Sequence, residues 1–283
     1  MRIQGIWQGI LILVVGLAAA ICCVPQTLAQ GHTYYVDPGG SDLSGDGSAA
    51  HPWRTVQHAA AQVAPGDSAL TNLGTYEGGI TVETGGAAGS PITFRANGIG
   101  VVIDGSGGER DAFCITYADH IVVEGLTIRH ANRAGMRIDN SDHVTVRGCT
   151  FADNTTWGLF TDFSDHLLIE NNEAYGSVEQ HGIYVSNSGD YPIIRGNRVH
   201  HNYACGIHMN ADASMGGDGI ISHGLVEANV IYGNGAGGGA AINMDGVTDT
   251  IVRNNLLYGN HAGGIAVFRQ DGTVGSRLGD VGD

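Results

Sequence analysis

Between residues 122 and 257, one short phrase of alternating apolar and polar residues recurs six times. In each copy a charged side chain follows apolar ones and precedes glycine, asparagine or alanine, and another apolar residue lies two positions beyond the phrase. This alternation is typical of a β-strand rather than a helix. The last positions of successive copies are 23, 23, 25, 32 and 26 residues apart. The copies are Val122–Leu126, Thr145–Cys149, Leu168–Asn172, Ile193–Asn197, Leu225–Asn229 and Ile251–Asn255.

A second segment with the period of a strand follows each phrase. Its apolar residues alternate with residues of mixed character, so we expect pairs such as Met136/Ile138 and Ile207/Met209 to point inward and the residues between them to point outward. The segments are Gly135–Ile138, Gly158–Thr161, Gly182–Val185, Gly206–Met209, Ala241–Met244 and Gly264–Val267.

Several short strands in a repeat of some 23 residues, without a helical stretch between them, predict an all-β chain folded as a single parallel β-helix. A doubly wound sheet and a leucine-rich horseshoe both need helices or other spacings and are excluded. One coil cannot bury its own apolar face, so coils stacked about 4.8 Å apart must join their inward residues into one core.

Asparagines recur at two positions of the repeat, where we expect tight bends. Asparagine tolerates left-handed backbone, and its amide can bond to the next coil. We therefore predict structural rather than catalytic roles for two columns. They are Asn172, Asn197, Asn229 and Asn255, and Asn132, Asn154, Asn202, Asn234 and Asn260.

The two ends of the chain carry different signals. Residues 1–30 contain an apolar run behind one positive charge, which predicts a cleaved signal peptide, a secreted protein and no integral membrane segment after cleavage. Residues 54–64 have apolar residues at helical spacing and predict a helix that caps the first coil of a β-helix domain spanning 31–272. An irregular tail of little apolar content, 273–283, offers no C-terminal cap. Either a partner covers the last coil or the C-terminal end is truncated or frameshifted, and we expect the latter.

Composition narrows the partners. The 13 basic residues are all arginine, Asp and Glu total 28, and the net charge is −15. This balance argues against nucleic acids and anionic membranes as partners. We also expect a monomer. Cys114, Cys149 and Cys205 have neither the number for a disulfide framework nor the spacing of a zinc site, and we interpret them as small buried residues.

Several segments near the N-terminus stand apart from the repeat, namely Tyr34–Asp42, His51–Gln57, Pro65–Asp67, Gly74–Tyr76 and Gly89–Ala96. They resemble the first part of pectate-lyase-like right-handed β-helix proteins. This family includes polysaccharide lyases that act on alginate, chondroitin-type chains and pectate, so the resemblance implies a right-handed parallel β-helix and a polysaccharide partner. It transfers no catalytic residue, because the lysine base of several such lyases and the Asp-Pro-His motif of alginate epimerases are absent here.

The candidate site follows from one insertion and two outward rows. The 32-residue repeat contains extra residues, 210–224, and extra loops on a solenoid usually build its binding face. Beside this loop the outward positions of the second segment form a predicted sugar groove. Its rows are Arg137, Phe160, Tyr184, His208, Asn243 and Ala266, and Asp139, Asp162, Ser186, Asn210, Asp245 and Phe268.

For a lyase that cleaves an acidic polysaccharide by β-elimination, His208 or Tyr184 is the expected base. Ca²⁺ is the expected cofactor, held by oxygen ligands from Asp212, Asp218 and Asp245. The predicted substrate-binding residues are Arg137, Phe160, Asn210, Asn243 and Arg269, the last facing the substrate carboxylate.

Other interpretations remain open at this stage. A glycoside hydrolase would use Asp212 and Asp245 as an acid and base pair. A non-catalytic carbohydrate-binding or cell-surface solenoid would keep the outward rows without needing a base or a metal, and a truncated chain would be an inactive remnant. His181, His200 and His201 lie next to bends, where we expect structural roles.

Overall fold

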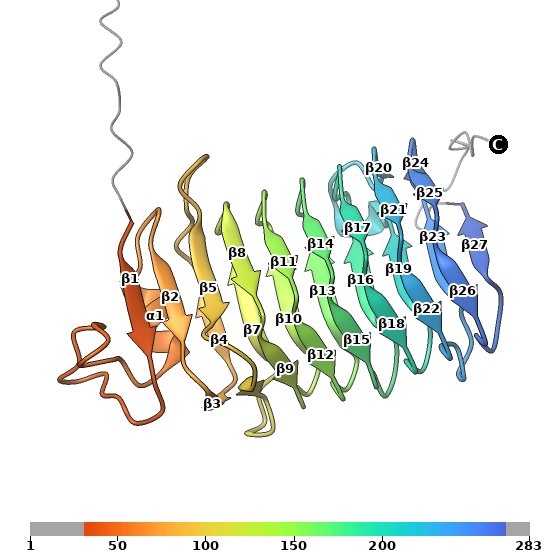
Figure 1. Cartoon of the computed structure of the whole chain (residues 1–283). Helices are drawn as coiled ribbons and strands as arrows, with labels where there is room; N and C mark the ends of the chain where they lie inside the picture. Colours follow the sequence, from red (N-terminus) through yellow and green to blue (C-terminus); the bar gives the residue numbers. More distant parts are fainter. Residues whose placement is uncertain (1–30, 270–283) are drawn as a thin grey trace, which may run out of the picture.

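The structure is a computed structural model that describes residues 31–269, and the predicted signal peptide and tail lie outside this range. It is a parallel β-helix, as predicted, in which each coil contributes strands to three long sheets (Figure 1). We number the sheets by the order in which a coil visits them.

The first sheet contains β1 (Thr33–Val36), β2 (Ser68–Thr71), β5 (Ile92–Ala96), β8 (Ile121–Glu124), β11 (Thr145–Arg147), β14 (Leu168–Glu170), β17 (Ile193–Arg195), β21 (Leu225–Glu227) and β25 (Ile251–Arg253). The second sheet contains β3 (Gly74–Glu77), β6 (Val101–Asp104), β9 (Thr127–Arg129), β12 (Thr150–Ala152), β15 (Glu173–Tyr175), β18 (Arg198–His200), β22 (Val230–Tyr232) and β26 (Leu256–Tyr258).

The third sheet contains β4 (Ile80–Val82), β7 (Asp111–Thr116), β10 (Ala134–Asp139), β13 (Trp157–Asp162), β16 (Ile183–Ser186), β19 (Ile207–Asn210), β23 (Ile242–Asp245) and β27 (Ile265–Phe268). The insertion of the 32-residue repeat forms the short helix η1 (Ala213–Met215) and β20 (Ile221–Ser222), which pairs with β24 (Val247–Thr248).

The recurring phrase is not one strand, because it crosses a bend between the first and second sheets. Its fourth residue has left-handed backbone in every copy, with φ of 75° at Gly125 and 55° at Ala228. A residue in this conformation interrupts the ladder and turns the chain. The asparagine that follows the bend therefore does not itself adopt the left-handed backbone that we predicted for it.

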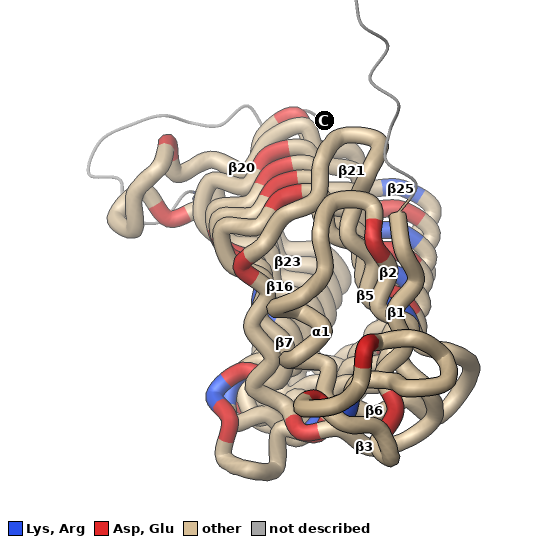
Figure 2. Tube along the Cα trace, turned by 90° about the vertical axis from the view of Figure 1, so that its left-hand side faces the viewer, with Lys and Arg blue, Asp and Glu red and all other residues tan. Residues whose placement is uncertain are grey.

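The interior is a continuous apolar column closed at one end by helix α1 (Val56–Gln62). Rings such as Phe94, Phe113 and Phe151 are fully buried within it. Helix α1 lies inside the predicted range 54–64, and Figure 2 shows it across the N-terminal end of the solenoid. Its buried face packs on β1, β2 and β4, and the side chain of Thr55 accepts a hydrogen bond from the amide of His58. Among residues 31–269, no helix has the length and apolar character needed to cross a membrane.

The first asparagine column is a hydrogen-bonded ladder, as predicted. The Oδ1 of Asn197 accepts from the amide N–H of Asn172 at 2.9 Å and from its Nδ2 at 3.1 Å. The Nδ2 of Asn197 donates to the carbonyl of Ile169 and to Oδ1 of Asn229. Because the strand ladder is interrupted at the bend, these side chains satisfy buried amides that have no strand partner.

The second column differs from the prediction at one position. Asn132 is exposed, and Ala131 is the residue whose amide donates to Oδ1 of Asn154, so Asn132 is not part of the ladder. Ser177, which the sequence pattern missed, takes the next position and donates its amide to Asn202. An asparagine one residue out of register points to solvent rather than into the bend.

Replacing Asn197 with alanine is expected to lower the free energy of unfolding by about 1–3 kcal/mol, because the buried amide of Asn172 loses its acceptor. Urea unfolding at neutral pH measures the change. Asn132→Ala is the matched control and should change the free energy by no more than about 0.5 kcal/mol. Equal effects of the two substitutions would contradict the ladder.

Candidate functional site on the third sheet

The two outward rows of the third sheet have the predicted register. Tyr184 pairs with Phe160 on one side and with His208 on the other, and His208 pairs with Asn243. The second row runs in parallel through Asp139, Asp162, Ser186, Asn210 and Asp245. The predicted substrate and catalytic residues of β10 to β23 therefore lie on one face.

A third column on this face was not predicted. Trp157, His181 and Cys205 each precede the glycine that opens the strand segment of their coil, and the amides of Gly158 and Gly182 donate to the carbonyls of His181 and Cys205. The sequence did contain a signal for this column, because its three residues precede glycines that occupy the same position of the repeat. The residue before each glycine sits at a bend, where alternation no longer says whether a side chain points in or out.

Trp157 covers Phe160. The ring centroids are 4.4 Å apart with an interplanar angle of 19°, and Phe160 is only 7% exposed. The indole Nε1 donates to Oε1 of Gln180 at 2.8 Å, which fixes the orientation of the ring. Phe160, predicted to bind substrate, thus presents little surface to a ligand, whereas the half-buried Trp157 beside it is open to solvent.

The positive charge of Arg137 is already balanced by carboxylates. Its Nη2 lies 3.0 Å from Oδ2 of Asp139 and 3.5 Å from Oδ2 of Asp162. Burial raises the pKa of Asp162, against hydrogen bonds such as that from Asn187, which lower it. An arginine held by two aspartates is a weaker partner for a substrate carboxylate than we predicted.

Tyr184 and His208, the two candidate bases, are neighbours. Their ring centroids are 4.8 Å apart, and Nε2 of His208 lies 3.2 Å from Oδ2 of Asp245. Burial raises the pKa of Tyr184, while Asn210, which donates to its Oη at 3.2 Å, opposes that rise. Asn243 donates a hydrogen bond to the same oxygen of Asp245 at 2.8 Å and is 7% exposed. Its amide is thus engaged by Asp245 and leaves little surface for a ligand.

Both ring nitrogens of His208 are buried and neither makes a hydrogen bond, because the 3.2 Å approach to Asp245 lacks hydrogen-bond geometry. Buried polar atoms without partners are rare in folded proteins, and each needs a physical explanation.

His181, for which we expected a structural role, lies next to both candidate bases. Its ring lies 4.3 Å from that of His208 and 5.2 Å from that of Tyr184. Burial, and then the neighbouring His208, lower its pKa to about 3, and its Nδ1 accepts the amide N–H of Cys205 at 3.1 Å. His200 and His201 lie on or directly after β18 of the second sheet and are not part of the site.

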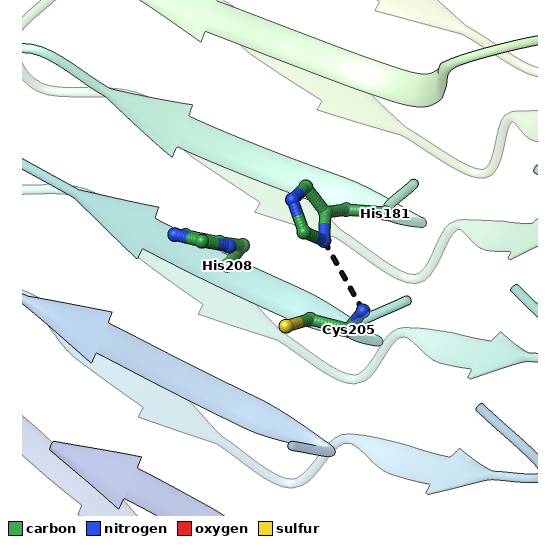
Figure 3. Close-up of side chains that lie close together, drawn as sticks. All are labelled: His181, Cys205 and His208. Atoms are coloured by element: carbon green, nitrogen blue, oxygen red, sulfur yellow. Dashed lines mark hydrogen bonds between the residues drawn. The ribbon is translucent and has the colours of Figure 1, made fainter. Parts of the chain in front are cut away.

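The carboxylates predicted to bind Ca²⁺ are not gathered. Asp212 caps η1 through the amide of Ser214, and Asp218 accepts the amide of Ile220. Within the described part of the chain, the one group of three metal-ligating side chains consists of His181, Cys205 and His208 (Figure 3). The pKa of Tyr184 is raised by burial and also by the charges of Asp212 and Asp245, so both carboxylates of the hydrolase alternative lie near this tyrosine and that alternative stays a prediction. Arg269 is exposed after β27, two strands beyond the strand of His208.

The motif Ser-Asp-His occurs twice, at 141–143 and 164–166, but it builds a corner of the solenoid. The rings of His120, His143 and His166 stack 4.7 Å apart. The aspartates beside them accept amides of the following coil, as Asp142 does from Asp165, and acidic residues form a column at this corner in Figure 2. The three side chains of each motif serve different columns and do not form a catalytic triad.

A cavity of about 610 Å³ lies at the N-terminal end and not on the outward rows. Its lining includes Asp42, Arg54 and Glu77, and Glu77 also lines an adjoining cavity of about 470 Å³.

Comparisons with known proteins identify a family that has this architecture. The sequence profile of the right handed beta helix region family matches residues 78–233. The Bacillus subtilis (strain 168) protein YwoF, itself uncharacterized, is 36% identical over 106 residues, which cover 35% of this chain and 22% of YwoF. The match thus spans about a fifth of that relative.

Solved structures share the fold. A rhamnogalacturonan lyase has a TM-score of 0.63 at 20% identity over 84% of this chain and 73% of its own. Pectate lyase Pel9A has a TM-score of 0.55 at 18% identity over 81% and 79%. An alginate lyase from Paenibacillus sp. str. FPU-7 has 0.51 at 20% identity over 83% and 97%.

The low pKa of His181 predicts acid sensitivity. An unfolded histidine takes up a proton near pH 6.5 while His181 takes one up only near 3, so protonation favours unfolding and stability falls as the pH drops through this window. Between pH 7 and pH 5 the contribution of His181 is about 2 kcal/mol. His181→Gln should remove that part of the pH dependence in urea unfolding with chelator present. The exposed His143→Gln should retain it, and an unchanged pH dependence in His181→Gln would contradict the burial argument.

Proposed function

The chain belongs to the right handed beta helix region family, and on this premise we propose that it is a secreted, polysaccharide-active protein. Its ligand lies along the outward rows of the third sheet, over β13, β16 and β19. The secretion part of the proposal rests on the signal-peptide features of residues 1–30.

One observation carries the proposal: aromatic and amide side chains occupy neighbouring coils on the same outer face. Trp157 and Tyr184 are each partly exposed, with ring centroids 5.6 Å apart, and Asn210 lies in the adjacent row. Rings that combine an apolar body with a polar edge, beside a few oriented polar groups, suit a sugar chain. The lyases that share the fold act on pectate, rhamnogalacturonan and alginate, which supports the substrate class by analogy.

Trp157→Ala is expected to weaken polysaccharide binding at least about tenfold, because an aromatic contact on one sugar is lost. Calorimetry of the full chain against alginate, pectate, chondroitin and a neutral xylan measures this. Tyr258→Ala is the matched control, since Tyr258 is 49% exposed on the second sheet. Binding that Trp157→Ala leaves intact, or that Tyr258→Ala removes, would place the ligand elsewhere.

A finer proposal is β-elimination on an acidic polysaccharide, with Tyr184 or His208 removing the proton beside the carboxyl group. The charge of Asp245, 3.2 Å from Nε2 of His208, favours it, because a carboxylate beside an imidazole stabilises the protonated form that a histidine base adopts after taking the proton. The substrate carboxylate still needs neutralisation. Since Arg137 is held by Asp139 and Asp162, a bound cation or Arg269 would have to supply it.

Ultraviolet absorbance of unsaturated product ends tests this reaction, with and without Ca²⁺. Tyr184→Phe or His208→Gln is expected to lower kcat at least about 100-fold with little change in KM, because a general base acts in the transition state. Tyr232→Phe, on the second sheet, should behave like the parent chain. Binding without any absorbance change would reject the lyase reaction and leave the carbohydrate-binding proposal standing.

A further inference from the structure

We propose that His181, Cys205 and His208 form a binding site for a divalent transition-metal ion, with zinc as the best fit. The ligand atoms of all three side chains lie within 4.8 Å of one another. They come from two neighbouring coils, and Figure 3 shows both imidazole rings and the thiol side by side along β16 and β19. The register of the solenoid brings them together although their spacing in the sequence resembles no zinc motif.

The chemistry of the donors selects the ion. One thiol sulfur and two imidazole nitrogens suit zinc and its neighbours, whereas Ca²⁺ and Mg²⁺ prefer oxygen. Ligand atoms of a tetrahedral zinc ion are roughly 3.5 Å apart, so small side-chain rotations suffice to close the group. Three protein ligands leave a fourth position, and the carboxylate of Asp245 lies beside it, 3.2 Å from Nε2 of His208.

The unpartnered nitrogens of His208 point to the same conclusion independently. Both are buried and neither makes a hydrogen bond. A metal ion would use the lone pair of one of them and thereby give a buried polar atom its missing partner. Nε2 lies 3.2 Å from the carboxylate of Asp245 but outside hydrogen-bond geometry, and Nδ1 has no hydrogen-bond partner among the described residues.

Binding requires two local changes. Burial raises the pKa of the Cys205 thiol to about 11, so an ion that binds the thiolate releases that proton to solvent. His181 binds through Nδ1 only if it gives up the hydrogen bond from the Cys205 amide. The backbone of Gly239 lies over the thiol, where an added Cβ would come within 2.6 Å of Sγ, so the ion enters from the partly exposed side of His208 and Asp245.

This inference goes beyond the proposed function and is tested without polysaccharide. A ligated His208 has no nitrogen left to act as a base, since the ion takes one and the other carries the proton. Tyr184 then remains the candidate base in the metal-loaded chain.

The test uses the full chain stripped with chelator and then titrated with Zn²⁺ by calorimetry and with Co²⁺ by absorption spectroscopy. We expect one ion per chain and a thiolate-to-cobalt charge-transfer band. Cys205→Ser should abolish the band, and Cys205→Ser, His181→Gln and His208→Gln should each raise the apparent Kd for Zn²⁺ at least about 100-fold. Thermal unfolding should show a Zn²⁺-dependent rise in Tm for the parent chain that these variants lack.

Two control variants test whether Zn²⁺ or Co²⁺ binds to thiols or imidazoles outside this site. Cys114→Ser removes a thiol of the same outer face, and His143→Gln removes a ring of the exposed histidine stack. Both should keep the parent affinity and the cobalt band. The proposal is overturned if the parent chain shows no thiolate band, or if binding survives all three site substitutions. The cobalt spectrum of the parent chain tests the proposal by itself, even if a variant fails to fold.

Discussion

Stacking each coil on its equivalent in the next is the constraint on which the rest of this structure depends. Along the strands the backbone supplies the bonds, residue against equivalent residue, through nearly the whole solenoid. At the bends the strand ladder stops, and side-chain oxygens such as Oδ1 of Asn197 and Asn202 take over as acceptors of buried amides. An unpaired amide at a bend would be buried without water, so these ladders hold the register where the strands cannot.

Because the register is fixed, residues at equivalent positions of successive coils lie in rows on the outer surface, and their charges lie next to one another. On the first sheet Glu124, Arg147, Glu170 and Arg195 follow one another with alternating sign and form ion pairs between coils. On the third sheet both outward arginines are held by aspartates, Arg133 by Asp111 and Arg137 by Asp139 and Asp162. Because these arginines are neutralised by their aspartates, the outer face of the third sheet offers a ligand mainly rings, amides and carboxylates, a surface that suits the proposed sugar partner.

The sequence predicted what alternation and repetition control. The outward rows from Arg137 to Asn243, the first asparagine ladder and the capping helix follow from period-two patterns and helical spacing, and the structure has them. The failures lie at bends. Asn132 is one residue away from the ladder position of Ala131, and the bend residue is the one before each ladder asparagine.

The same limit explains why the core of the site was missed. His181 and Cys205 stand directly before the glycines that open their strands, where neither alternation nor composition shows on which side a side chain lies. Trp157 stacks on Phe160 and covers it. A sequence alignment of the repeats does not show this, because it does not give side-chain rotamers. The sequence therefore predicted which residues follow one another along an outward row. It did not predict how exposed each side chain is or which side chains of neighbouring rows are in contact.

Hydroxyl-radical footprinting tests the central claim, that the outer face of the third sheet binds the polysaccharide, most directly. With the polysaccharide that binds in calorimetry, the oxidation rates of Trp157 and Tyr184 should fall, while those of Tyr203 and Tyr258, which are 50% and 49% exposed elsewhere, should stay constant. Protection of Tyr203 or Tyr258 with unchanged oxidation of Trp157 and Tyr184 would contradict the account and move the ligand to another face.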